Sequence, residues 1–268
     1  MGRKDIFMEL REFARKYPRA AVGFSGGVDS AYLLYAGLKE GADWHPVYIR
    51  SAFQPEFELE DAKRLCAMLG ADLTILEADI LSNPNVRSNP SDRCYYCKQV
   101  LFGHVAEWAR EQGIPLVLDG NNASDPPEDR PGMRAAKELG VRSPLREAGL
   151  TKAIIRKLSR EAGLSTWNKP AYACLATRVP TGSPIDAETL IKVDKSEAAL
   201  RQIGFSDFRV RIMQNAAKLQ LTENQMGTAI ENREQILNVL KPFFSEVMLD
   251  LNVRPGVELP TLTEREVD

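Results

Sequence analysis

Residues 25–30, with the sequence S-G-G-V-D-S, combine residue types that hold phosphate. They follow an apolar run, residues 20–24, that is typical of a buried strand, and they precede an apolar stretch, residues 31–36, that is typical of a helix. The two glycines let the backbone approach an anion, and the helix start offers free N–H groups and the positive end of a dipole. Ser25 and Ser30 add hydroxyl donors, whereas Asp29 indicates that the loop also binds a metal or orients another group. The spacing therefore predicts a phosphate-binding loop.

The loop differs from two common phosphate-binding motifs. It contains neither G-x-x-x-x-G-K-[ST] nor G-x-G-x-x-G. It resembles instead the PP-loop, S-G-G-x-D-S, of the ATP pyrophosphatases, which split ATP into AMP and pyrophosphate and usually adenylate a substrate. Because every motif position matches and the flanking strand and helix are expected, we favour this interpretation over an ordinary glycine-rich turn.

Three of the four cysteines suit metal or sulfur chemistry. Cys94 and Cys97 form a C-x-x-C pair at the start of an expected helix, where a helix dipole stabilises thiolates. Cys174 lies in an irregular segment, where active-site residues are often found. Three thiolates suit a 4Fe–4S cluster with one open iron, whereas zinc, a redox pair and purely structural cysteines remain alternatives. Cys66 is interpreted as a packing residue, because it lies on the apolar face of an expected helix.

Two arginines form the second candidate binding site. Arg209 and Arg211 alternate on an expected strand and therefore share one face of it. Planar, permanently charged guanidinium groups suit phosphate, and Arg178 follows the Cys174 segment. A solvated strand face with ion pairs is equally compatible with the pattern.

These residues require a scaffold, and the alternation of strand and helix patterns predicts one. The helices between the strands are expected at residues 58–69 and 94–111. Strands are expected at residues 20–24, 44–49, 73–76 and 115–118. This order predicts an α/β protein with a doubly wound parallel sheet, in which ligands bind beyond the carboxyl ends of the strands. Asp119 would then lie in a loop at the same edge as the phosphate-binding loop.

The remainder of the chain predicts a second, smaller unit. We expect residues 1–170 to form the PP-loop ATP pyrophosphatase domain and residues 171–268 to form a C-terminal α+β domain for substrate binding or oligomerisation. The boundary falls in an irregular segment that two prolines and a glycine follow. Expected elements are a helix at 187–203, strands at 208–213 and 218–221, a helix at 231–240 and a strand at 246–251.

Composition limits the function classes. The chain has 268 residues, of which 44% are hydrophobic and 27% charged, and its net charge of −2 argues against a dedicated nucleic-acid binder. No apolar run approaches the roughly 18 residues of a membrane span, and the N-terminus lacks the apolar core of a signal peptide. We therefore expect a cytoplasmic protein whose cysteines are not in disulfides.

Along most of its length the chain resembles the LarE family of ATP-dependent sulfur transferases. The resemblance rests on residues 25–30 (S-G-G-V-D-S), 118–121 (L-D-G-N), 130–132 (R-P-G), 167–170 (W-N-K-P), 174–178 (C-L-A-T-R) and 209–211 (R-V-R). It implies an adenine nucleotide alpha hydrolase-like fold. It also implies a step in making the nickel-pincer nucleotide cofactor, in which a carboxylate of a pyridinium dicarboxylate mononucleotide is adenylated and becomes a thiocarboxylate.

The resemblance assigns roles to individual residues. ATP and its pyrophosphate would be bound by Ser25, Gly26, Gly27, Asp29 and Ser30, with Mg²⁺ neutralising the developing charge. The substrate phosphate would be bound by Arg209, Arg211 and Arg178. Asp29 and Cys174 would be catalytic. Glu197 matches a carboxylate metal ligand of the second domain, but Gln220 and Thr228 stand where further carboxylates are expected.

The sulfur source divides the family. Some members sacrifice the sulfur of their own cysteine, which Cys174 could supply here, and others hold a 4Fe–4S cluster on three cysteines and relay sulfide. The presence of Cys94 and Cys97 with Cys174 favours the cluster.

The resemblance also implies partners, and other functions stay open. The partners would be a nucleotide-like small-molecule substrate, a sulfur donor and further copies of the chain. A PP-loop tRNA thiolase, an ammonia-using amide synthetase and a non-catalytic nucleotide-binding protein are the alternatives. The near-neutral charge counts against the tRNA thiolase.

Overall fold

A computed structural model describes residues 3–125 and 131–256 of the chain. The first half contains α1 (Arg3–Lys16), β1 (Arg19–Gly23), α2 (Val28–Lys39), β2 (Asp43–Arg50), α3 (Glu56–Leu69), β3 (Thr74–Glu77), η1 (Ile80–Ser82), α4 (Pro84–Arg87), α5 (Arg93–Glu111), β4 (Val117–Leu118), α6 (Pro131–Glu138), α7 (Pro144–Glu147), α8 (Lys152–Glu161) and η2 (Ser165–Asn168). The second half contains η3 (Leu175–Arg178), α9 (Ala187–Gln202), β5 (Arg209–Met213), β6 (Ala216–Gln220), α10 (Glu223–Glu231), α11 (Arg233–Leu240) and β7 (Glu246–Leu249).

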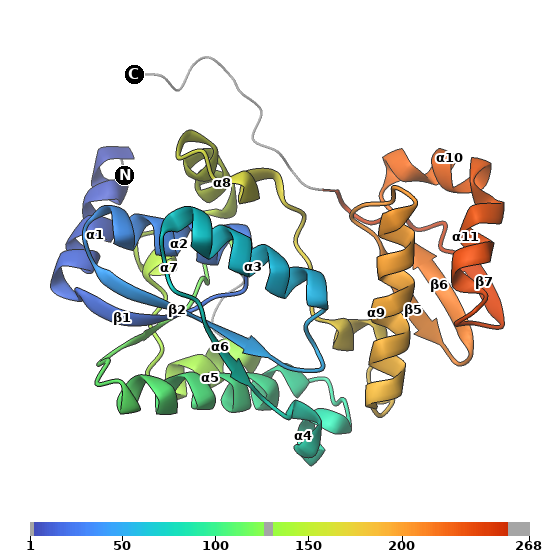
Figure 1. Cartoon of the computed structure of the whole chain (residues 1–268), viewed down its shortest axis with the longest axis horizontal. Helices are drawn as coiled ribbons and strands as arrows, with labels where there is room; N and C mark the ends of the chain where they lie inside the picture. Colours follow the sequence, from blue (N-terminus) through green and yellow to red (C-terminus); the bar gives the residue numbers. More distant parts are fainter. Residues whose placement is uncertain (1–2, 126–130, 257–268) are drawn as a thin grey trace.

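Within those ranges the strands form two sheets, which Figure 1 shows in separate halves of the molecule. Sheet A is parallel and has the order β3-β2-β1-β4. The chain moves outward from β1 to β3 and then returns through α5 to place β4 beside β1. The switch point therefore lies between β1 and β4, whose carboxyl ends lead into residues 24–27 and residues 119–125. This arrangement confirms the predicted doubly wound parallel sheet.

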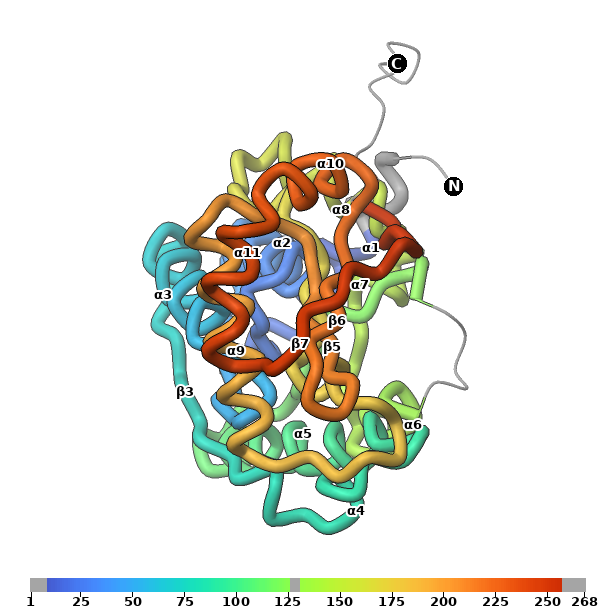
Figure 2. The backbone as a smooth tube through the Cα atoms, turned by 90° about the vertical axis from the view of Figure 1, so that its right-hand side faces the viewer, coloured from blue at the N-terminus to red at the C-terminus, as the bar shows by residue number. Residues whose placement is uncertain are grey.

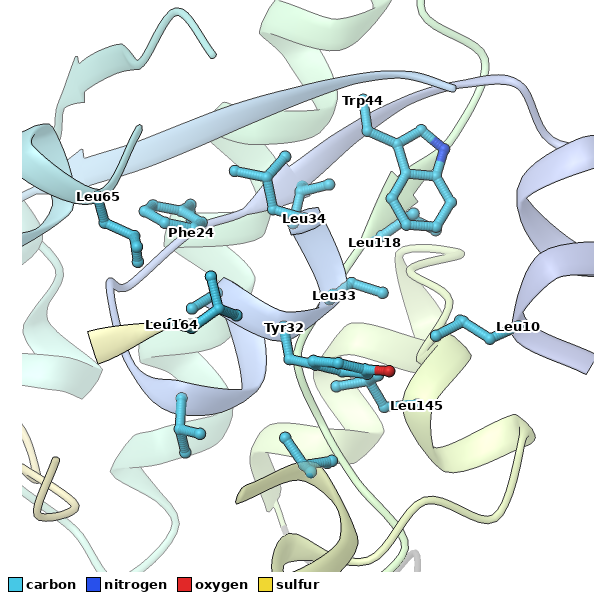
Figure 3. Packing of buried hydrophobic residues seen from close by; sticks show 14 of the residues in the cluster. Leu10, Phe24, Tyr32, Leu33, Leu34, Trp44, Leu65, Leu118, Leu145 and Leu164 are labelled. Atoms are coloured by element: carbon cyan, nitrogen blue, oxygen red, sulfur yellow. The ribbon is translucent and has the colours of Figure 1, made fainter. Parts of the chain in front are cut away.

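Helices cover both faces of sheet A because the buried side chains of its strands alternate. Ala20 and Val22 of β1 pack with α2 and α3, whereas Ala21 between them packs with α5 on the opposite face. Figure 3 shows the first layer, in which Leu33 and Leu34 of α2 lie among the buried side chains. Two packed layers hold the sheet rigid, so its carboxyl edge is a firm base for a binding site.

Element boundaries differ from the predictions in three places. Strand β4 has two residues instead of the predicted four, and beyond it Asp119 N–H donates to the carbonyl of Arg142 at 2.9 Å. The expected loop at 81–93 contains α4, because Pro84 occupies the first helical turn and Asn83 caps it by accepting from Asn85 N–H at 3.0 Å. The single helix expected at 231–240 is two helices, α10 and α11, with a break at Asn232.

Sheet B combines an antiparallel pair, β5 and β6, with β7 parallel to β6. Viewed from that side in Figure 2, α9 and α11 lie along one side of these strands. Leu200 of α9 and Ile236 of α11 share a buried cluster with Val210 and Leu219 of the sheet. The opposite face of β5 carries Arg209 and Arg211, as the alternation predicts.

The segment from Cys174 to Ile185 is bonded to the first half of the chain. Leu175 N–H donates to the carbonyl of Phe53 at 2.9 Å, and Ile185 N–H donates to the carbonyl of Arg87 at 2.8 Å. Phe53 and Leu175 also belong to one buried cluster. This segment is thus shared between the two halves, and the domain boundary at residue 170 stays a prediction. Among the described residues, no helix has the length and apolar character that a membrane crossing requires.

Candidate active site

The glycine loop, residues 24–30, joins β1 to α2 at the carboxyl edge of sheet A. Gly26 has φ of +68°, and a Cβ there would lie 3.3 Å from the backbone of Ala62 in α3, so a side chain is excluded by conformation and by space. Helix α2 begins at Val28, and Gly27 provides no side-chain cap. The first N–H groups of α2 are therefore available to an anion, as the sequence predicts.

The two serines of the loop stabilise its turn. Ser25 N–H donates to Ser30 Oγ at 3.3 Å, and Ser30 Oγ lies 3.3 Å from the carbonyl of Gly27, to which it donates. Ser25 Oγ lies 3.3 Å from Ser30 Oγ, so the two hydroxyl groups are adjacent. They can turn toward a phosphate without any change in the backbone.

Asp29 orients neighbouring groups, which is one of the two roles that the sequence suggests for it. Its carboxylate forms an ion pair with Lys152 at the start of α8 and accepts from Asn122 Nδ2 at 3.3 Å. Burial raises the pKa of Asp29, and the adjacent Lys152 ammonium opposes that rise. Sequence reasoning missed Lys152 and Asn122, because no motif links them to the loop. Their positions at a capped helix start and beyond a strand end were the available signals.

The loop that follows β4 packs directly on the glycine loop. A Cβ on Gly120 would lie 3.0 Å from the backbone nitrogen of Ser30, so only glycine allows this approach. Asp119 is buried and accepts from Ser143 Oγ at 2.7 Å and from Asn121 N–H at 3.1 Å. Burial raises the pKa of Asp119. The prediction that Asp119 lies beside the phosphate-binding loop is consistent with this packing.

Lys169 connects the glycine loop to α3. Its Nζ donates to the carbonyl of Gly26 at 3.2 Å and lies 2.8 Å from Asp61 Oδ2. Lys169 belongs to the W-N-K-P block, for which sequence reasoning gave no role. Arg130 of the R-P-G block lies outside the described residues.

The three candidate cysteines come from two segments that meet. Cys97 on α5 and Cys174 before η3 are half-buried against one apolar cluster, whereas Cys94 is exposed. Burial raises the pKa of Cys97 to about 12, and the neighbouring Cys174 and Cys94 add to the rise. Cys66 is buried in the core, as expected. Across residues 3–125 and 131–256, no group of three or more His, Cys, Asp or Glu side chains is arranged to hold a metal ion. The 4Fe–4S cluster therefore stays a prediction.

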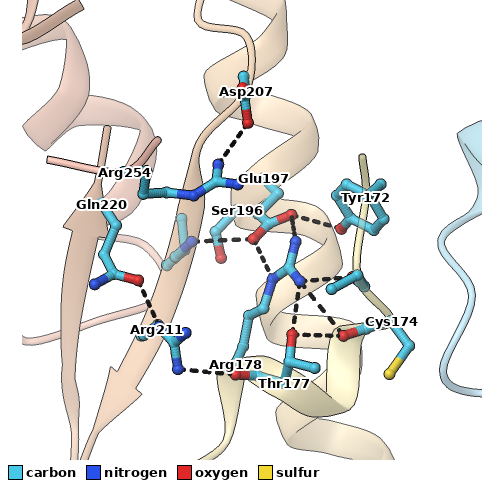
Figure 4. Close-up of polar contacts among 12 residues, drawn as sticks. Tyr172, Cys174, Thr177, Arg178, Ser196, Glu197, Asp207, Arg211, Gln220 and Arg254 are labelled. Carbon is cyan, nitrogen blue, oxygen red and sulfur yellow. Dashed lines mark hydrogen bonds and ion pairs between the residues drawn. The ribbon is translucent and has the colours of Figure 1, made fainter. Parts of the chain in front are cut away.

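Arg178 holds the Cys174 segment in place (Figure 4). Its side chain is fully buried, and its Nε and Nη2 donate to the two oxygens of Glu197 at 2.8 and 3.0 Å. Its Nη1 donates to the carbonyl of Ala173 at 2.6 Å. The sequence suggested a phosphate ligand, but burial and these contacts make Arg178 a positioning residue for the segment that carries Cys174.

Glu197 is a counterion in this structure, not an open metal ligand. Besides Arg178, it accepts from Tyr172 Oη at 2.5 Å and from Val210 N–H at 3.0 Å. Its carboxylate is completely buried, so the bonded donors occupy the oxygens that a metal would need. The metal role that the resemblance attached to Glu197 therefore does not fit. Gln220, at one of the positions where a carboxylate was expected, bonds to Arg211 and to Asp250.

Arg209 and Arg211 differ in their partners. Arg211 donates to the side chain of Gln220 and, at 3.2 Å, to the carbonyl of Thr177. In the described part of the chain, Arg209 has no hydrogen bond or ion pair, although its side chain is half-buried. Burial lowers the pKa of Arg209 to about 10, and the neighbouring charges of Arg254, Arg178 and Arg211 lower it further. A half-buried guanidinium among like charges is a favourable place for an anion.

Comparison with known proteins places the chain in a family. No family model matches it. It is 36% identical over 248 residues to an uncharacterized protein of Synechocystis, covering 90% of this chain and 92% of that protein. It is 33% identical over 253 residues to the pyridinium-3,5-bisthiocarboxylic acid mononucleotide synthase of Lactiplantibacillus plantarum, covering 93% and 92%. It is also 25% identical over 193 residues to the tRNA-specific 2-thiouridylase MnmA of Thermotoga petrophila, covering 56% and 54%.

The parallel sheet with S-G-G-V-D-S at its carboxyl edge, together with these relatives, defines an enzyme of the PP-loop class, the ATP-using sulfur transferases. Within that class the chain belongs to the LarE family, that of the pyridinium-3,5-bisthiocarboxylic acid mononucleotide synthase. The predicted resemblance is therefore confirmed.

Proposed function

We propose that the protein adenylates a carboxylate of a pyridinium dicarboxylate mononucleotide and converts it to a thiocarboxylate in nickel-pincer nucleotide cofactor synthesis. The supporting observation is the meeting of two segments on α3. Ala62 and Asp61 of α3 contact the glycine loop and its Lys169, and Phe57, one turn earlier, contacts Tyr172 at 5.0 Å between ring centroids. One helix turn thus separates the proposed pyrophosphate site from the segment that carries Cys174.

The first half-reaction belongs to the glycine loop. A carboxylate oxygen attacks the α-phosphorus of ATP, an acyl-adenylate forms, and pyrophosphate leaves. The N–H groups of Gly27 to Ser30 and the hydroxyl groups of Ser25 and Ser30 would bind the departing phosphates. Mg²⁺, when bound beside Asp29, would neutralise charge on the phosphates, and Lys152 would turn from Asp29 toward them.

The second half-reaction takes place toward the cysteine segment. A sulfur nucleophile attacks the acyl carbon, the new C–S bond forms, and AMP departs with the electrons of the C–O bond. Arg209 would hold the phosphate of the mononucleotide, because it is the arginine of β5 whose guanidinium has no protein partner among the described residues. Arg211 would assist from the same strand face.

Cys94, Cys97 and Cys174 would hold the proposed 4Fe–4S cluster, which supplies sulfide when bound. The donor set fits, because three thiols from two segments surround one apolar patch and sense one another electrostatically. A cluster also spreads its ligands more widely than a single metal ion does. Because burial raises the pKa of Cys97 and Cys174, both thiols must lose protons as metal binds. The sacrificial use of Cys174 sulfur is the alternative.

The test is anaerobic purification with iron, sulfide and absorbance measured together, followed by conversion of the mononucleotide with ATP, Mg²⁺ and sulfide. We expect AMP, pyrophosphate and thiocarboxylate in equal amounts, and loss of both iron and turnover in Cys97→Ser. A colourless protein that reacts once and becomes lighter by about 32 Da, one sulfur from a consumed nucleophile, would support the sacrificial route instead. Failure to release pyrophosphate from ATP would contradict the proposed function.

The matches to MnmA keep tRNA thiolation as a second candidate. These matches cover about half of either chain, and the net charge of −2 gives no general attraction to RNA. Salt-sensitive binding of tRNA would favour this candidate. Turnover with ammonia and without a sulfur donor would favour an amide synthetase.

A further inference from the structure

Sulfur transfer from an S–H group needs a proton acceptor, and few groups of this chain can serve. The chain has two histidines. His45 is at the amino end of β2 and pairs with Asp43 at 2.9 Å, and His104 is exposed on α5. Carboxylates are therefore the remaining candidates near the proposed site.

Most carboxylates around the site already have partners. Asp29 is paired with Lys152, Asp61 is paired with Lys169, and Asp119 accepts from Ser143. Glu197 is occupied by Arg178. Each of these groups is held as an anion by a donor, which makes it a poor proton acceptor.

Glu58 is different. It is half-buried in the first turn of α3, and its carboxyl forms no hydrogen bond or ion pair with any residue in the described ranges. Nearby, the hydroxyl of Tyr48 on β2 is buried without a hydrogen-bond partner. Two unsatisfied polar groups on adjacent elements require an explanation, because buried polar groups are normally bonded.

The turn that carries Glu58 is fixed from both halves of the molecule. Arg201 of α9 lies 3.9 Å from the ring centroid of Phe57, and that ring packs edge-on against Tyr172. Asp194 of α9 accepts from Glu56 N–H at the helix start. On the other side, Ala62 lies against Gly26 of the glycine loop. Glu58 is thus held on a rigid turn between the proposed pyrophosphate site and the Cys174 segment.

We propose that Glu58 accepts the proton of the sulfur nucleophile in the second half-reaction. This inference rests on the proposed function. The nucleophile H–S–R attacks the acyl carbon of the adenylate, the C–S bond forms and the C–O bond to AMP breaks. The S–H proton passes to the Glu58 carboxylate, which later releases it to solvent through its exposed part. AMP leaves as an anion, so the step is redox-neutral and needs no other reactant.

The charges around Glu58 are suited to this role. Burial raises the pKa of Glu58 to about 7; Lys169 and Arg178 lower it, Asp61 raises it and Arg201 lowers it. Glu56 and Arg50 are the other charged groups near the Tyr48 hydroxyl. At neutral pH the carboxyl can therefore both take up and release a proton.

The experiment compares Glu58→Gln with the wild-type protein in the two half-reactions separately. Adenylation is measured as ATP–pyrophosphate exchange with the mononucleotide, and sulfur transfer as thiocarboxylate formation from sodium sulfide between pH 5.5 and 9. We expect exchange within about threefold of wild type and sulfur transfer slower by about 100-fold, the usual scale of lost acid–base catalysis. The rise in rate with an apparent pKa near 7 should disappear, apart from the titration of sulfide itself.

Glu60→Gln is the matched control, because Glu60 lies on the same helix, half-exposed, and contacts Lys63. Its pH profile should coincide with that of the wild type, and Glu58→Asp should recover part of the lost rate. Sulfur transfer by Glu58→Gln at the wild-type rate would overturn the proposal, and so would an equal loss in both half-reactions. Absence of exchange in the wild type would instead mean that the proposed function has failed.

Discussion

The glycine loop and the arginine strand β5 balance their charges in opposite ways. At the glycine loop every charged side chain described above has a partner of opposite sign: Asp29 with Lys152, and Asp61 with Lys169. On β5, Arg209 has no such partner and lies among three other arginines. Both regions were predicted to bind phosphate.

The difference indicates how each region would receive its anion. The glycine loop offers backbone N–H groups, which carry no net charge and are ready before the ligand arrives. It suits a phosphate chain that arrives with Mg²⁺. The arginine strand holds an excess of positive charge that only an incoming anion relieves. It suits a phosphate that arrives without a metal.

The buried pair between Arg178 and Glu197 offers the largest test, since it shows what a charge with a full set of partners does. We expect Glu197→Ala to lower the free energy of unfolding by about 3–5 kcal/mol, because Arg178 is left buried and unpaired. Urea unfolding measures this effect. Glu188→Ala, an exposed change on the same helix, should alter stability by less than about 0.5 kcal/mol.

The pair also separates a positioning role from a binding role. A double variant, Arg178→Met with Glu197→Leu, should recover much of the stability while sulfur transfer stays low, because the Ala173 carbonyl has lost its donor. Full activity in a stable double variant would show that Arg178 is not needed to place Cys174.

Asp29→Asn is expected to have the next largest effect. ATP–pyrophosphate exchange should fall by about 100-fold, equivalent to roughly 2.7 kcal/mol, because an amide neither attracts Mg²⁺ nor pairs with Lys152. Thermal unfolding should change little, since the site is at the edge of the sheet. Asp72→Asn, an exposed position between α3 and β3, is the control. Unchanged exchange in Asp29→Asn would remove Asp29 from the proposed pyrophosphate site.

The smallest effect is predicted at Arg209. Inorganic phosphate should raise the unfolding temperature of the wild type by a few degrees, because binding to the folded state alone adds about RT ln(1 + [L]/Kd) of stability. Arg209→Gln should be at least as stable without phosphate, since a crowded positive charge is removed, and should lose most of the phosphate response. Arg233→Gln, at an exposed arginine of α11, should respond like the wild type. An equal response in Arg209→Gln would place the phosphate elsewhere.

The sequence predicted the sheet well because its signals are local. Apolar strands alternate with amphipathic helices, and each boundary carries a glycine or a cap, so the order of elements needs no tertiary information. Strand β4 was overestimated because its partner beyond Asp119 is the backbone of Arg142, which no local pattern reveals. The break at Asn232 was missed for a similar reason, since α10 and α11 read as one apolar period.

The candidate site was only partly predictable. The glycine loop and the shared face of Arg209 and Arg211 follow from motif and period. Lys152, Lys169 and Glu58 were missed because they reach the site from separate elements, and spacing along a chain does not report distances across a fold.

By itself, the sequence determined the class of fold, the phosphate-binding turn and the resemblance to one family, since each depends on residues that are neighbours along the chain. Only the tertiary structure decided which charges are already neutralised. Arg178 and Arg209 look alike as residues of two short motifs, yet one is fully buried against Glu197 and the other has no partner in the described ranges. The reason is that burial and pairing arise where distant segments meet, and the energy of a charge depends on those surroundings.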